Sequence, residues 1–169
     1  DSVERIDILA SENIGIEGRS VFYEQTGAML DVIQSHLLQL AALTLMTFPE
    51  ENAVPQARYA ALRALHVVPD QTRRGQYEGY REEVHNPEST VETFASLTLL
   101  STDPRWRDVP ITLTTGKALS EKKTSITITY RKRSGQEDFT FQIQPSEKNE
   151  SYDAYGHIFL GALQNDHSL

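Results

Sequence analysis

The longest regular pattern of apolar positions runs through residues 26 to 46. Its apolar side chains recur at intervals of three or four residues, which places them on one face of an α-helix. They are Met29, Ile33, Leu37, Leu40 and Leu43. The segment contains no proline and no glycine after Gly27, so its backbone chemistry allows a helix of about five turns. The pattern predicts one long amphipathic helix.

A histidine interrupts the apolar face of this helix. His36 lies seven residues after Met29 and four before Leu40, so a helical wheel places it on or beside the buried stripe. It is either a core histidine that bonds a backbone carbonyl or a general base in a cleft. Asp31 lies five residues earlier, about 140° away on an α-helix, so the two side chains do not share a face. They could still approach one ligand that lies across the helix.

Alternation of apolar and polar residues predicts strands elsewhere in the chain. Residues 3 to 10 form the first of these, with Ile6 and Ile8 on one side. Further predicted strands cover residues 93 to 100, 111 to 116, 124 to 132 and 138 to 144, and a hairpin turn covers residues 133 to 138. A second helix is predicted at residues 57 to 65, a long loop at 72 to 89 and a last helix at 153 to 163.

The order of these elements predicts the fold class. Short connections between the last strands favour antiparallel pairing. We therefore expect an α+β domain, with helices packed on one face of a largely antiparallel sheet, and a single domain over residues 1 to 169. The other face is either solvated or a subunit interface, and it carries Thr127, Thr129, Thr140 and Gln142.

Composition narrows the classes of function. The chain is 38% hydrophobic and 24% charged, which is typical of a globular domain. Its net charge of −8 argues against a general binder of nucleic acid or of anionic membranes. The absence of cysteine excludes disulfides and thiolate chemistry and fits a reducing cytoplasm. No single apolar run approaches the ~20 residues of a membrane span.

Lysines concentrate between two of the predicted strands. The segment TTGKALSEKKTSI carries Lys117, Lys122 and Lys123. Two ammonium groups on a loop between rigid strands can hold a phosphate dianion, although lysines are also common on solvated hairpins. Glu12 and Glu17 are open to two interpretations. Each could belong to a site, or could simply cap or solvate the loop before the long helix.

The motifs taken in order resemble a known family. The segments SENIGIEGR, DVIQSHLLQ, RWRDVP, TGKAL, FQIQPSE and DAYGHIFLGALQND follow the order found in the C-terminal domain of glucose-6-phosphate dehydrogenase. The resemblance runs from about residue 3 to residue 169. It implies a mixed, mainly antiparallel sheet behind helices, used for a dimer or a dimer of dimers.

The resemblance also implies roles for individual residues. His36 matches the base that takes the proton of the anomeric hydroxyl of glucose 6-phosphate, while hydride passes to NADP. Asp31 and Glu12 match carboxylates that bind sugar hydroxyls. The remaining matches in the substrate site are Lys117, Lys122 and Gln144. We expect no metal, and the implied setting is cytoplasmic sugar metabolism.

Several features depart from the family pattern. Leu30 replaces an arginine and Ser35 an asparagine. Between residues 147 and 153 the family has some tens of further residues, and the family's usual end lies beyond residue 169. The glycine-rich turn that binds a dinucleotide is missing, along with the lysine, histidine and tyrosine motif of the phosphate site.

These departures lead to three hypotheses. The chain is the substrate and catalytic-base domain of a dehydrogenase and is inactive alone, a non-catalytic sugar-phosphate-binding relative, or a dimerisation module.

Overall fold

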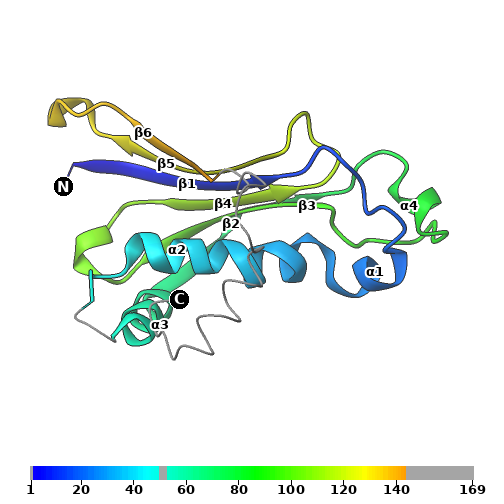
Figure 1. Ribbon diagram of the computed structural model, residues 1–169, viewed down its shortest axis with the longest axis horizontal. Helices are drawn as coiled ribbons and strands as arrows, with labels where there is room; N and C mark the ends of the chain where they lie inside the picture. Colours follow the sequence, from blue (N-terminus) through cyan, green and yellow to red (C-terminus); the bar gives the residue numbers. More distant parts are fainter. Residues whose placement is uncertain (1, 50–52, 144–169) are drawn as a thin grey trace, which may run out of the picture.

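A six-stranded mixed sheet organises the chain, and helices cover one of its faces (Figure 1). The computed structural model describes residues 2–49 and 53–143, with strand order β2-β3-β4-β1-β5-β6. The strands are β1 (Val3–Ser11), β2 (Leu65–Gly75), β3 (Phe94–Ser101), β4 (Ile111–Gly116), β5 (Lys123–Tyr130) and β6 (Phe139–Ile143). β1 and β4 are parallel, and every other neighbouring pair is antiparallel. The expected α+β fold is confirmed.

The helices follow the prediction in outline. They are α1 (Ser20–Ala28), η1 (Met29–Leu37), α2 (Leu38–Leu45), α3 (Val54–Arg63) and α4 (Tyr80–Glu83), with short 3₁₀ turns η2 (Pro104–Trp106) and η3 (Lys132–Ser134). A proline in the first turn starts α3, where its missing N–H costs no hydrogen bond. The predicted long helix begins earlier than expected, at Ser20, and Gly27 breaks its regularity with a φ of 57°.

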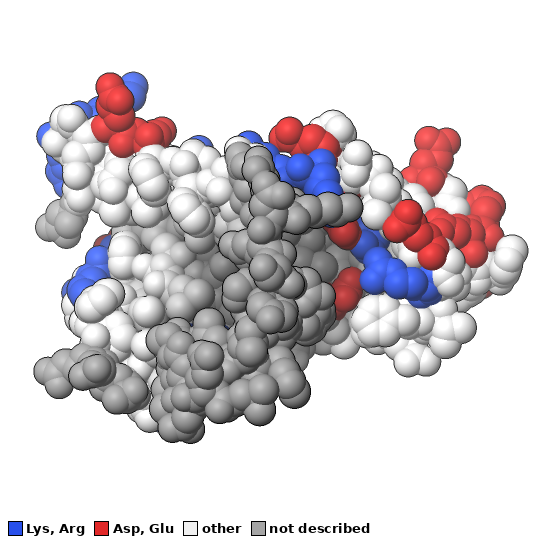
Figure 2. Space-filling view, viewed as in Figure 1, with Lys and Arg blue, Asp and Glu red and all other residues white. Residues whose placement is uncertain are grey.

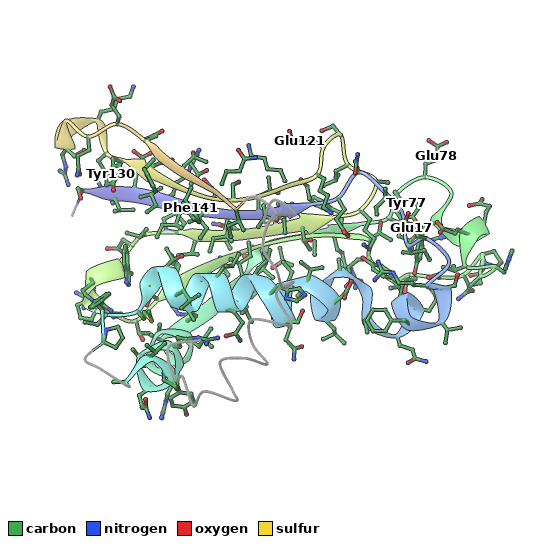
Figure 3. The ribbon with its side chains drawn as sticks, viewed as in Figure 1. Glu17, Tyr77, Glu78, Glu121, Tyr130 and Phe141 are labelled. Carbon is green, nitrogen blue, oxygen red and sulfur yellow. The ribbon has the colours of Figure 1, made fainter. Side chains whose placement is uncertain are left out.

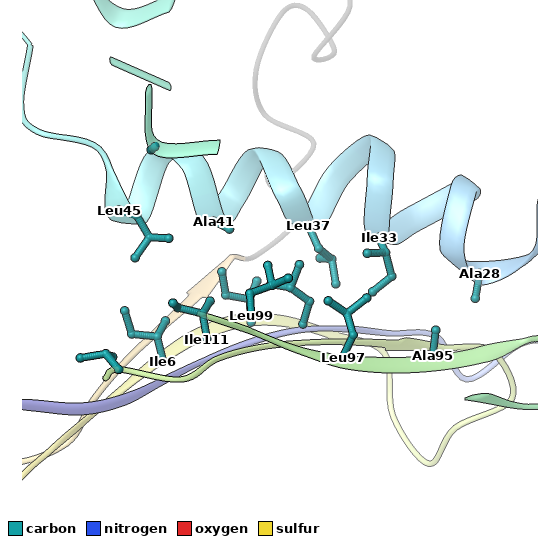
Figure 4. Packing of buried hydrophobic residues seen from close by; sticks show 14 residues of the cluster. Ile6, Ala28, Ile33, Leu37, Ala41, Leu45, Ala95, Leu97, Leu99 and Ile111 are labelled. Carbon is teal, nitrogen blue, oxygen red and sulfur yellow. The ribbon is translucent and has the colours of Figure 1, made fainter. Parts of the chain in front are cut away.

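The core lies between this long helical stretch and the sheet (Figure 4). Ile33 and Leu37 of η1 and Leu45 of α2 point down onto the strands. They meet buried side chains of β1, β3 and β4, which are Ile6, Ile8, Leu97, Leu99, Ile111 and Leu113. Alternate residues of these strands face the helices, as the period of two predicts.

The apolar stripe predicted from the sequence is wrong at Leu43 and misses two buried alanines. Leu43 was expected on the buried stripe and is 46% exposed, whereas Ala41 and Ala42 are buried. The cause is η1, a π-helical segment in which the N–H of Leu38 bonds the carbonyl of Ile33, five residues back. Each such turn holds more residues than an α-turn, so the buried face is displaced along the sequence.

One strand was missed from the sequence. β2 pairs with β3 over part of the segment that was expected to be the end of a helix and a loop. It is an edge strand with Pro69 inside it and a register shift between Val68 and Arg73. Proline is tolerated in edge strands and at bulges, and it hides such strands from pattern analysis.

The stretch Ser20–Leu45 also differs from expectation in its length. By length and composition it qualifies as a possible membrane span, which was not apparent from single apolar runs. A core helix passes the same criterion, and here the apolar face packs on the sheet. The predicted helix at residues 153 to 163 and the segment between residues 147 and 153 lie outside the described residues.

The predicted second face of the sheet is partly open. Thr140 and Gln142 of β6 are exposed, while Thr127 and Thr129 of β5 are half-buried. The hydroxyls of Thr127 and Thr140 bond each other at 3.1 Å across the two strands.

Candidate active site

A cavity of about 460 Å³ opens where β1 and β4 end. These two strands are the parallel pair, so their carboxyl ends meet at one edge, the usual place of ligands in sheets with parallel strands. The size falls within the range of small-molecule sites. Its charged or titratable lining residues are Glu12, Arg19, Asp31, His36, Lys117 and Lys122. Figure 2 shows acidic and basic side chains close together in this region, between the helices and the sheet.

The π-helical segment brings Asp31 and His36 to one cavity. On an α-helix these residues would lie about 140° apart. Hydrogen bonds between residues five apart instead place His36 about one turn beyond Asp31, and both line the cavity. His36 is exposed rather than buried, so the interpretation as a core histidine is wrong.

A carboxylate from another segment holds the start of η1. The Oε1 atom of Glu92 accepts a hydrogen bond of 2.9 Å from the N–H of Met29. The N–H of Ala28 donates to the carbonyl of Glu92 at 2.9 Å. A Cβ atom at Gly27 would collide with the Glu92 carboxylate, so this glycine allows the close approach. Glu92 therefore fixes the segment that carries Asp31 and His36.

Lys117 is buried, with only 3% of its surface exposed, so its interpretation as a solvated lysine is wrong. Its ammonium group forms an ion pair with Glu12 and lies 5.6 Å from the ring centroid of Tyr23. The backbone makes this pairing possible. The N–H of Glu12 donates to the carbonyl of Gly116 at 2.9 Å, where the two strands end. Burial, followed by the negative charges of Asp31, Glu92 and Glu12, raises the pKa of Tyr23 and keeps its phenol neutral.

Other predicted residues have different settings. Lys122 is exposed and lines the cavity from the loop between β4 and β5, where Figure 3 shows Glu121 near the tip. Glu17 is exposed and does not line the cavity. Gln144 lies outside the described residues.

The sequence interpretation missed Arg19. Its side chain lines the cavity, and its Nε donates to the carbonyl of Ile16 at 3.2 Å. The available signal was its position beside Gly18 in the EGR motif, directly before the helix. Arg19 adds a third cation to the two lysines, so one cavity combines an imidazole, two carboxylates and three cations.

A second small core supports this end of the sheet. Tyr23 of α1 and Tyr80 of α4 are buried together with Ile16. Tyr80 donates to Glu24 at 2.6 Å, and Ser89 and Asn86 donate to the same carboxylate at 2.6 and 2.8 Å. The predicted long loop is thus a packed support of the helix that leads to η1.

No group of three or more His, Asp or Glu residues that could hold a metal ion occurs within residues 2–49 and 53–143. The titratable groups that line the cavity are an imidazole, two carboxylates and three cations.

The sequence matches a family model over most of its length. Residues 1–150 match the family described as glucose-6-phosphate dehydrogenase, C-terminal domain. The chain belongs to this family. The resemblance inferred from the motifs is confirmed.

Relatives in the glucose-6-phosphate dehydrogenase family are longer than this chain. Glucose-6-phosphate 1-dehydrogenase of Gluconobacter oxydans (strain 621H) is 36% identical over 149 residues, which cover 78% of this chain and 30% of the relative. A cytoplasmic isoform of Arabidopsis thaliana, glucose-6-phosphate 1-dehydrogenase 6, is 35% identical over 161 residues, which cover 87% of this chain and 31% of the relative. The chain thus spans about a third of the length of these curated relatives.

Two solved structures share the fold. The crystal structure of glucose-6-phosphate 1-dehydrogenase from Mycobacterium avium matches with a TM-score of 0.79 and 34% identity, over 86% of this chain and 35% of that one. A glucose-6-phosphate dehydrogenase in complex with its substrate glucose-6-phosphate matches with a TM-score of 0.82 over 99% of this chain and 45% of that one. The identity in the second case is 23%, so that likeness concerns the fold alone.

Proposed function

We propose that this chain is the substrate-binding and catalytic-base domain of a glucose-6-phosphate dehydrogenase, which oxidises glucose 6-phosphate to the lactone. One observation carries the proposal: the imidazole of His36, the carboxylate of Asp31 and the ammonium of Lys117 share one cavity. A sugar phosphate needs those three kinds of partner, which are a proton acceptor, acceptors for hydroxyl groups and cations for the phosphate. Membership of the family supports the same assignment.

Each side chain then has a role. His36 accepts the proton of the anomeric hydroxyl, and its exposure in the cavity leaves the ring free to reach a ligand. Asp31 and Glu12 accept hydrogen bonds from sugar hydroxyls. Lys117 and Lys122 hold the phosphate, with Arg19 as the additional cation found in the structure.

The coenzyme NADP supplies the hydride acceptor in this proposal. The described part of the chain does not fit it, because it contains no strand, glycine-rich turn and helix of the dinucleotide-binding kind. We therefore assign NADP to a separate nucleotide-binding domain and expect the 169-residue chain to show no turnover alone. An NADP-dependent rate from the purified chain, abolished by His36→Ala, would contradict this.

We also infer a cytoplasmic, oligomeric enzyme. The name of one relative describes it as cytoplasmic. The open face of β5 and β6 supports a dimer or a dimer of dimers, because Thr140 and Gln142 are exposed there. Sedimentation of the chain tests this part of the proposal.

Calorimetric titration with glucose 6-phosphate tests the binding function. We expect saturable binding that is at least tenfold stronger than that of glucose and is lost in Lys117→Ala. Lys123→Ala is the matched control, since it removes the same charge from the same segment without lining the cavity. Equal binding of both sugars, or equal effects of both variants, would overturn the proposal.

A further inference from the structure

A second cavity, of about 260 Å³, lies at the opposite end of β1. Val3 lines it at the start of this strand, whereas Glu12 follows the strand's end at the first cavity. The strand has nine residues, which at ~3.3 Å each separates the two cavities by roughly 25 Å. The N-terminus, the loop that carries η2 and the turn that carries η3 gather at this end of the molecule (Figure 1).

The lining of this second cavity is strongly basic. Four arginines contribute to it against a single carboxylate, that of Asp108. The arginines are Arg105, Arg107, Arg131 and Arg133. Such a surplus of positive charge is unexpected in a chain with a net charge of −8. An acidic protein that gathers guanidinium groups around a hollow creates a local attraction for anions.

Three of the four guanidinium groups are available to a ligand. Arg105 is occupied, because it pairs with Asp103 at 2.6 Å and donates to the carbonyl of Leu45. Among the described residues, the side chains of Arg107, Arg131 and Arg133 form no ion pair or hydrogen bond. Planar guanidinium groups without internal partners are suited to bidentate contacts with phosphate oxygens.

The backbone around the cavity is held in place before any ligand arrives. The N–H of Arg131 donates to the carbonyl of Ser2 at 2.8 Å, and the N–H of Ile6 donates to the carbonyl of Pro110 at 3.0 Å. These bonds tie one arginine-bearing segment to β1 and the other to the residue directly before it. The backbone that carries the arginines is therefore ordered before binding, which lowers the entropy that binding costs.

We propose that this arginine cavity is an anion site for a phosphate group, distinct from the sugar-phosphate cavity. Its volume is below the ~300 Å³ at which pockets begin to enclose drug-sized ligands. It therefore suits inorganic phosphate or the phosphate end of a larger molecule. The cavity offers neither a histidine nor a carboxylate pair for catalysis, so the proposed role is binding.

Titration of the 169-residue chain with inorganic phosphate, followed by amide NMR, tests the proposal. We expect saturable shifts at Arg107, Arg131 and Arg133 in the wild-type chain. Arg133→Gln should weaken this binding at least fivefold. The matched control is Lys132→Gln, because Lys132 is exposed in the same turn, carries the same charge and does not line the cavity. It should change the dissociation constant less than twofold.

Two results would overturn the proposal. One is equal weakening by both variants, which would indicate diffuse electrostatic attraction. The other is a wild-type titration whose shifts are confined to the first cavity, a readout that does not depend on any variant folding.

A parallel titration with methyl phosphate distinguishes the source of the anion. Tighter binding of the methyl ester indicates the end of a phosphorylated molecule, and tighter binding of inorganic phosphate indicates the free ion. Both support the site.

Discussion

The two cavities at the ends of β1 differ in the charges of the residues that line them. The cavity at the carboxyl end mixes charges of both signs, with Lys117 buried against Glu12. The cavity at the amino end is lined by four arginines, of which only Arg131 is half-buried and the others are exposed, and by the single carboxylate of Asp108. Mixed charge next to an imidazole suits a ligand with both hydroxyl groups and a phosphate. A cavity lined by four arginines and a single carboxylate suits an anion, and the variants below test this contrast.

Lys117→Met should have the largest effect on folding. It leaves the Glu12 carboxylate without its partner, and breaking a fully buried pair typically costs about 3–5 kcal/mol. Because the Glu12 side chain is 35% exposed, we expect a smaller loss, about 2–3 kcal/mol, in the free energy of unfolding. Urea denaturation measures it. Lys122→Met, on the exposed lysine of the same cavity, should change this free energy by less than about 0.5 kcal/mol. Equal losses would contradict the buried pair.

Glu92→Ala should have the second largest effect on folding. It removes the acceptor for the Met29 N–H at the start of η1, which resembles the loss of a helix cap and should cost about 1–2 kcal/mol. Glucose 6-phosphate affinity should fall together with stability, because η1 carries Asp31 and His36. Glu92→Gln, which keeps an acceptor oxygen, should recover most of both quantities. Glu88→Ala, an exposed neighbour, is the control. An unchanged affinity in Glu92→Ala would show that the cap does not position the site.

A fall in pH should destabilise the small core around Tyr80 and Glu24 that supports the mixed-charge cavity. Burial acts to raise the pKa of Glu24, but hydrogen bonds from Ser89, Tyr80 and Asn86 outweigh it and lower that pKa. A lowered folded pKa stabilises the fold above the pKa of the unfolded carboxyl, about 4.3, and this stabilisation is lost as pH falls through the folded value.

Unfolding curves between pH 6 and pH 3 measure this loss. Glu24→Gln should reduce the pH dependence by about 1 kcal/mol, the net scale of a typical intramolecular hydrogen bond. Glu78→Gln, at an exposed position visible in Figure 3, should leave it unchanged. A wild-type dependence equal to that of Glu24→Gln would show that the three donors contribute nothing.

Arg133→Gln should have the smallest effect on folding. Arg133 is exposed and lines the arginine cavity, so its removal should change the free energy of unfolding by less than about 0.5 kcal/mol. Thermal unfolding in a buffer without phosphate is the measurement. Destabilisation as large as that of Lys117→Met would mean that the arginines serve the fold rather than a ligand.

Alternating patterns predicted most of the sheet because its central strands bury one face. Ile111–Gly116 was predicted with its observed bounds, and Val3–Ser11 differs by one residue. Pattern analysis failed at β2, where a proline and charged residues on an edge strand remove the alternation. It also failed at η1, because a period of 3.6 residues does not describe a π-helical segment.

The candidate site was also predicted only in part. His36, Asp31, Glu12, Lys117 and Lys122 were identified from family motifs, and the structure places all five in one cavity. Their burial and pairing were not predictable, since Lys117 meets a carboxylate 105 positions away in the chain. The arginine cavity was equally invisible, because its residues come from three separate segments.

The most direct test of the shared cavity follows the ring protons of His36 by NMR during addition of glucose 6-phosphate. His85, an exposed histidine that does not line this cavity, is the internal reference. We expect a saturable shift at His36, none at His85, and loss of the shift in Lys117→Ala. A His36 signal that stays constant at saturating sugar phosphate, or that moves equally with plain glucose, would contradict the assignment of base and lysine to one substrate site.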